Sequence, residues 1–99
     1  MKLREFLQVD PASLHLPGSR RDGVDPLKLL RQLARYGTST NGMPPPEVKR
    51  GTDTQLVIYD GVTRATRVAK YLPGTLITVE VTGKLNGPVG GLPTVGEKL

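Results

Sequence analysis

The sequence predicts an α/β domain of the α+β class. We expect a small mixed sheet of about four strands, two main helices and a Gly/Pro-rich C-terminal arm. Three observations support this. Apolar residues recur at helical spacing in two segments, they alternate at strand spacing in others, and glycines and prolines gather between and after them. The 99 residues suit a single domain. We place that domain at residues 1–82 and a tail or arm at residues 83–99.

Residues 26–36 carry the clearest helix signal. Asp25 is expected to cap this helix, because its carboxylate can accept hydrogen bonds from the first amides. Pro26 suits the first helical position, and Gly37 can adopt the positive φ that ends a helix. Apolar side chains between these ends follow helical spacing. They are Leu29, Leu30, Leu33 and Tyr36.

Strand signals surround a second helix. We expect a short turn or helix at the N-terminus and then a strand around Val9. Residues 47–49 and 55–59 read as a hairpin, and residues 75–81 as a strand, because β-branched residues alternate with polar ones. A helix over residues 62–72 would join the last two of these strands.

The second helix is expected to be amphipathic. One arc of its surface gathers the apolar residues and should face the core. That arc holds Val62, Ala65, Val68, Ala69 and Leu72. The opposite side is expected to face solvent, and it holds Thr63, Thr66, Arg67 and Lys70.

Composition narrows the functional classes. The chain has no cysteine, which excludes disulfides, thiolate metal sites and thiol chemistry. Its net charge of +5 favours anionic partners such as nucleic acid, nucleotides or acidic proteins. No apolar stretch is long enough to span a bilayer and the N-terminus lacks a secretory pattern, so we expect no membrane and a cytoplasmic location. No cluster of His, Asp and Glu has metal-ligand spacing, so no metal site is predicted.

The junction between residues 55–59 and 62–72 has the parts of a phosphate-binding turn. Asp60 ends the strand, Gly61 permits a tight turn, and the free amides of a helix start attract anions. Thr63 adds a hydroxyl, and Arg64 and Arg67 add forked cationic donors. A purely structural alternative is that Asp60 caps the helix and the basic residues are solvated.

The order of these pieces resembles the ParB/sulfiredoxin superfamily. That family runs through a helix, a glycine- and proline-rich approach to a strand, a hairpin, an Asp-Gly-His-x-Arg turn that opens a helix, and a last strand. The matching pieces, after a similar opening at Val9–Leu14, are Pro26–Tyr36, Gly42-Met43-Pro44-Pro45, Val48, Gln55–Tyr59, Asp60-Gly61-Val62-Thr63-Arg64-Ala65 and Ile77–Val81.

The resemblance implies roles for the motif residues. Gly61 and Thr63 would contact phosphate, Arg64 would neutralise it, and Asp60 would orient the turn or a metal. The implied cofactor is a nucleotide with Mg²⁺. Val62 stands where the family has a histidine, so acid–base catalysis at that position is lost. Sulfiredoxin activity is excluded because the chain lacks cysteine.

Three functions remain open at this point. The first is a ParB-like module that binds a nucleotide or nucleic-acid phosphate with little or no catalysis, through Asp60, Gly61, Thr63, Arg64 and Arg67. The second is an enzyme, either a nuclease or a small ATP-dependent phosphotransferase that resembles free-serine kinases. Its candidate catalytic groups are Asp60, Glu5 and His15, although His15 is better explained as an ordinary surface or half-buried histidine. The third is an accessory module that binds a protein partner through its Gly/Pro tail.

Overall fold

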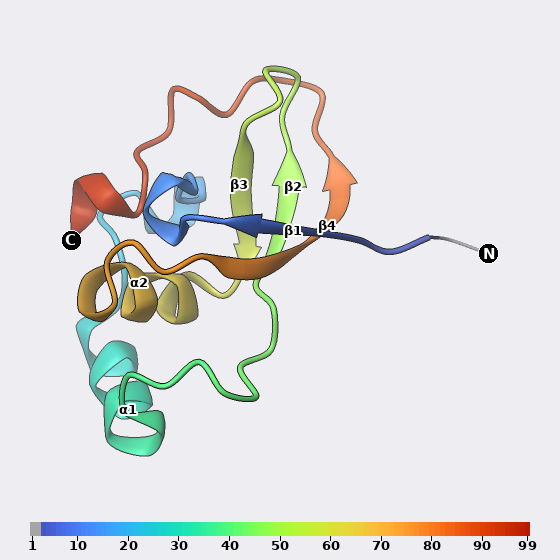
Figure 1. Cartoon of the computed structure of the whole chain (residues 1–99). Coiled ribbons are helices and arrows are strands. Elements are labelled where there is room, and N and C mark those ends of the chain that lie inside the picture. Colours follow the sequence, from blue (N-terminus) through green and yellow to red (C-terminus); the bar gives the residue numbers. More distant parts are fainter. Residues whose placement is uncertain (1–2) are drawn as a thin grey trace.

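A computed structural model describes residues 3–99 and shows a four-stranded sheet with two α-helices (Figure 1). The fold class is therefore confirmed. The elements are β1 (Glu5–Val9), α1 (Pro26–Tyr36), β2 (Glu47–Arg50), β3 (Leu56–Asp60), α2 (Val62–Tyr71) and β4 (Ile77–Lys84). Three short 3-10 turns join them, namely η1 (Pro11–Ser13), η2 (Gly18–Arg20) and η3 (Gly96–Lys98).

The sheet is mixed, with the strand order β1-β4-β2-β3. Strand β4 pairs antiparallel with β1 and parallel with β2, and β2 and β3 form the predicted antiparallel hairpin. The connection from β3 to β4 contains α2, and this helix lies across one face of the sheet. Val48, Ile58 and Val79 lie fully buried on that face.

The N-terminal segment is a strand where a turn or short helix was expected before Val9. Strand β1 pairs with β4 along its whole length, from Glu5 opposite Val81 to Val9 opposite Ile77. Phe6 and Leu7 mimic a helical repeat, but pairing with a distant strand overrides this local pattern. The prediction of a strand around Val9 is confirmed, and η1 follows that strand directly.

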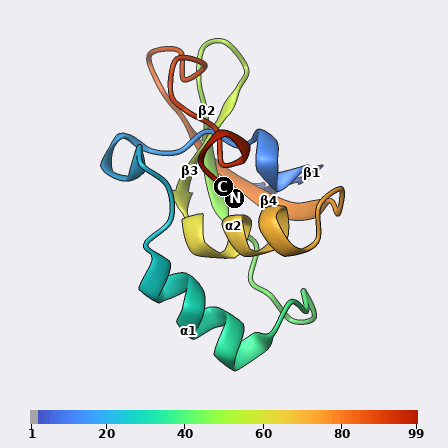
Figure 2. The ribbon, with the colours of Figure 1, turned by 90° about the vertical axis from the view of Figure 1, so that its left-hand side faces the viewer.

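Helix α2 lies between the sheet and α1, as Figure 2 shows. Its apolar arc packs on the sheet as expected, with Ala65 and Val68 fully buried. The expectation that its other side faces solvent is wrong for Thr66 and Arg67, which are only 3% and 2% exposed. Because α1 covers this second side, α2 is enclosed on two faces.

The segment after β4, expected to be either a tail or an arm, packs against the domain as an arm. Strand β4 continues to Lys84, and beyond it Val89 and Val95 are buried. The backbone around His15 pairs with β3 on one side and with this segment on the other, because Ile58 donates its amide to the His15 carbonyl and Val95 donates its amide to the Leu14 carbonyl. We call residues 85–99 the C-terminal arm. None of the helices over residues 3–99 is long and apolar enough to cross a membrane.

Candidate functional site

The turn between β3 and α2 is built around Gly61. Its φ of +111° suits glycine and strains other residues. A Cβ atom there would lie 2.8 Å from Cβ of Pro46, closer than non-bonded carbons approach. The backbone therefore passes tightly against the loop that leads into β2, and α2 begins at once at Val62.

The first turn of α2 has free amides. Among residues 3–99, no side chain caps this helix, and its first turn contains no acidic residue. Asp60 does not fold back onto the amides, because its Oδ2 pairs with Nη2 of Arg64 at 3.2 Å. Helix α1 differs, since Asp25 accepts a hydrogen bond from the Leu27 amide at 2.9 Å. The start of α2 thus keeps the partial positive charge of an unsatisfied helix end.

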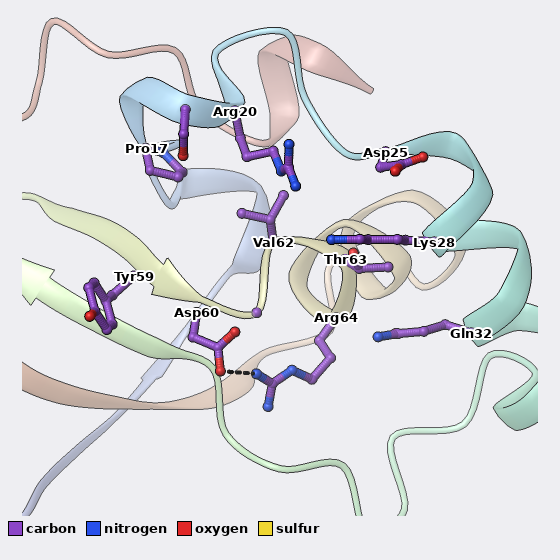
Figure 3. Close-up of a pocket in the computed structure, with 12 residues that line it drawn as sticks. Pro17, Arg20, Asp25, Lys28, Gln32, Tyr59, Asp60, Val62, Thr63 and Arg64 are labelled. Atoms are coloured by element: carbon purple, nitrogen blue, oxygen red, sulfur yellow. Dashed lines mark hydrogen bonds and ion pairs between the residues drawn. The ribbon is translucent and has the colours of Figure 1, made fainter.

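These amides face a pocket of about 460 Å³ between α1, η2 and the start of α2. Figure 3 shows Arg20 extending from η2 and Lys28 and Gln32 extending from α1, all toward the first turn of α2. Thr63 and Arg64 line the pocket from α2 itself. Three separate segments therefore bring polar and cationic groups together at one helix start.

The charge in this pocket is mainly positive. Asp25 and Asp60 line it, but one caps α1 and the other pairs with Arg64. The ion pairs among residues 3–99 include neither Arg20 nor Lys28. The pocket therefore holds two cations that have no carboxylate partner, beside free helix amides, and an anion fits this combination.

Sequence reasoning did not assign Arg20, Lys28 and Gln32 to this site. Two signals were available: residues 17–24 form a basic loop, and Lys28 stands on a helix without acidic residues. Neither signal shows that η2 and α1 converge on α2, because that proximity depends on tertiary packing.

Arg64 belongs to the pocket but is partly committed to structure. Its Nη1 donates to the Pro44 carbonyl at 3.0 Å, and its side chain is 16% exposed. Together with the Asp60 pair, this bond ties the start of α2 to the proline-rich loop. Arg64 therefore places a fixed positive charge at the edge of the pocket.

Arg67 does not line this pocket, which corrects its assignment to the phosphate site. Its Nη1 donates to the carbonyls of Gly37 and Ser39 at 3.0 and 2.9 Å, where α1 ends. Both carbonyls follow the last residue of α1, so the buried guanidinium ties the chain segment that leaves α1 to α2. A helical wheel places Arg67 opposite the apolar arc but does not show that α1 covers it.

The three candidate catalytic groups lie apart. Glu5 pairs with Arg50 at 2.7 Å on the sheet, and this hydrogen bond lowers the pKa of the Glu5 carboxyl. His15 is 7% exposed, and its Nδ1 lies 2.7 Å from the Leu92 carbonyl of the C-terminal arm. Of the three, only Asp60 borders the pocket. The structure thus gives Glu5 and His15 structural contacts and does not bring them to the α2 start.

The comparisons with known proteins bring no relative. No protein-family model, curated protein or solved structure matches the chain. The resemblance to the ParB/sulfiredoxin superfamily therefore stays a prediction from the order of motifs, and the site must be interpreted from its own geometry. Among residues 3–99, no group of three or more His, Asp and Glu residues is placed to hold a metal ion.

Proposed function

We propose that this domain binds a phosphate group of a nucleotide or nucleic acid at the first turn of α2, as a ParB-like module with little or no catalysis. The observation that carries the proposal is the uncapped start of α2, which opens into a pocket with two unpaired cations. A phosphate would satisfy the amides and the cations together.

Each residue has a defined part in this proposal. The amides after Gly61 donate hydrogen bonds to phosphate oxygens, and the Thr63 hydroxyl adds another donor. Lys28 and Arg20 approach from the opposite wall and supply the balancing charge. Arg64 places a fixed positive charge at the edge of the pocket, and its ion pair holds Asp60 away from the amides.

The geometry favours binding over catalysis. Val62 at the motif position can neither transfer a proton nor bind a metal. Mg²⁺ in nucleotide sites is usually held by one or two carboxylates together with phosphate oxygens. To bind Mg²⁺ here, Asp60 would have to break its ion pair with Arg64, or Asp25 would have to give up its hydrogen bond at the start of α1. The residues fit a phosphate better than a phosphate with its metal.

The decisive experiment removes the unpaired cations. The double variant Arg20→Gln with Lys28→Gln should weaken binding of ATP, CTP and a 5′-phosphorylated oligonucleotide by about tenfold or more, because each charged hydrogen bond contributes about 1.5–3 kcal/mol. Binding is measured by titration at constant ionic strength. Which ligand binds the wild-type protein tightest distinguishes a nucleotide site from a nucleic-acid site.

The matched control is Arg31→Gln with Arg35→Gln, which removes the same two charges from exposed positions on α1 outside the pocket. Its affinity should stay close to that of the wild-type protein. Equal losses in both variants would reveal a general charge effect and would refute the site. Wild-type affinity in the Arg20→Gln, Lys28→Gln variant would refute it as well.

An enzyme remains the alternative and makes a different prediction. Plasmid DNA, or ATP with free serine, would be turned over in the presence of Mg²⁺, and Asp60→Asn would abolish the turnover. A binding module shows no such Asp60-dependent reaction. Docking of a protein through the C-terminal arm has less support, because burial of Val89 and Val95 already commits much of the arm to the fold.

A further inference from the structure

A second cavity, of about 400 Å³, lies beside the first. It is enclosed by the end of α1, the loop at residues 39–44 and the outer side of α2. Gln32 and Arg64 line both cavities, while Tyr36, Met43 and Arg67 line only the second. This volume lies within the range of small-ligand pockets.

Arg67 is an unusual residue to line such a cavity, because it is a cation with only 2% of its surface exposed. The ion pairs among residues 3–99 do not include it. Its Nη1 is satisfied by two backbone carbonyls. These carbonyls and the ring of Tyr36, whose centroid lies 5.5 Å from Cζ of Arg67, are neutral groups and supply no full counter-charge. A buried cation without a carboxylate is costly, and an anion in contact with it would be strongly stabilised.

The edge of the Arg67 guanidinium formed by Nε and Nη2 indicates which kind of anion would bind. Among residues 3–99, Nε has no hydrogen-bond partner, and Nη2 on the same edge donates only to the sulfur of Met43 at 3.3 Å. A thioether is a weak acceptor. The Nε–Nη2 edge is the fork that binds a carboxylate through two parallel hydrogen bonds. Met43 covers this fork with an unbranched, flexible side chain that can adopt other rotamers.

We propose that the second cavity binds a small organic carboxylate, which displaces the Met43 sulfur and pairs with Nε and Nη2 of Arg67. The organic body of the ligand packs against Tyr36, Met43 and Pro44. The buried Oε1 of Gln32 has no hydrogen-bond partner in the described part of the chain and can accept from a donor group on the ligand. This site is separate from the proposed phosphate site and does not depend on it.

A carboxylate suits these walls better than phosphate does. Tyr36, Met43 and Pro44 give this cavity aromatic, thioether and proline surfaces, which favour an organic ligand over an inorganic ion. Removing a doubly charged ion from water also costs more than removing a single charge. A neutral amide of the same shape would leave the Arg67 charge without a counter-ion. The site should therefore bind a carboxylate more tightly than it binds either phosphate or a neutral amide.

The test compares benzoate with its neutral isostere benzamide and with inorganic phosphate. Arginine Nε–H signals of the ¹⁵N-labelled wild-type protein are followed by NMR during each titration. Saturable binding of benzoate that shifts the Arg67 signal is expected, with at least tenfold weaker binding of benzamide and no shift of that signal with phosphate. No shift with benzoate, or equal binding of benzamide, would overturn the proposal. A phosphate effect of the same size at Arg67 would overturn the choice of carboxylate.

Two variants sharpen this test. Arg67→Lys keeps the charge but removes the fork, so benzoate binding should fall at least tenfold, whereas the same change at exposed Arg31 should have no effect. Met43→Leu removes the sulfur that competes for Nη2 and should tighten benzoate binding; equal or weaker binding would overturn the displacement. If Arg67→Lys does not fold, the wild-type Arg67 signal still decides the proposal.

Discussion

Gly61 shows how a single residue shapes the proposed site. Its positive φ and its contact with Pro46 let β3 end and α2 begin without an intervening loop. This role could be read from the Asp-Gly dipeptide, because glycine is the residue that tolerates such a backbone. The contact with Pro46 could not be read, since it joins two segments that are distant in sequence.

The variant Gly61→Ala tests this role. The strained φ and the 2.8 Å approach to Pro46 should lower the free energy of unfolding by about 1–3 kcal/mol. Chemical denaturation measures the change. Gly74→Ala is the control, because its φ is also positive but, apart from its two chain neighbours, no residue in the described range 3–99 lies within 4 Å of the added methyl group. A loss no greater at Gly61 than at Gly74 would show that the Pro46 contact is unimportant.

At the scale of elements, the two helices and most strands were predictable, whereas the start of β1 and the contacts between elements were not. The bounds of α1 followed from Asp25 and Gly37, which cap it as expected. The same reasoning failed for Arg67, because one helical wheel assumes one buried face and α2 has two. It also failed for Arg20 and Lys28, which reach the pocket only because η2 and α1 fold over the start of α2.

The β2–β3 turn also holds the C-terminal arm. Asp53 Oδ2 accepts hydrogen bonds from the amides of Val89 and Gly90 at 3.2 and 2.8 Å. Desolvation raises the pKa of Asp53, but these bonds and those from Gln55 and its own amide outweigh it, so the pKa lies below its usual value. Because the pKa of Asp53 is lower in the folded state than in the unfolded state, the ionised carboxylate stabilises the fold at pH values above the unfolded pKa of 3.8. This stabilisation is lost as the pH falls through the pKa of the folded state.

Asp53→Asn should therefore destabilise the domain at neutral pH, because the amides lose a charged acceptor. The difference in melting temperature between wild type and variant should stay constant at neutral pH and disappear as the pH falls below 3.8. Thermal melts across this range measure it. A difference that persists at the lowest pH would show that the carboxylate charge does not hold the arm.

At the scale of the whole molecule, the C-terminal arm is part of the core. Val95 belongs to the same buried cluster as Leu14, Leu16 and Val68. The Gly/Pro-rich composition was compatible with a tail or an arm and did not show which form it takes, because the buried valines and the hydrogen bonds that secure the arm have partners distant in sequence.

Truncation after Lys84 should remove cooperative unfolding or lower the melting temperature sharply. Full burial of one valine contributes about 1.5–3 kcal/mol, and small domains have only about 5–15 kcal/mol in total. Circular dichroism during heating measures the effect. Deletion of Leu99 alone, whose side chain is half exposed, should leave the melt unchanged. A cooperative melt near the wild-type temperature in the long truncation would show that the arm is dispensable.

The pairing of β1 with β4 also bears on biosynthesis. Glu5 pairs with Val81, so β1 leaves the ribosome long before its partner strand β4 is made. His15 likewise has no bridge to Thr94 until that residue emerges. Until then, Leu14 and Leu16 lack part of their cover, and the nascent chain is most exposed to aggregation and proteolysis. The sheet can thus be completed only after translation through Lys84, and the core only after translation through Val95.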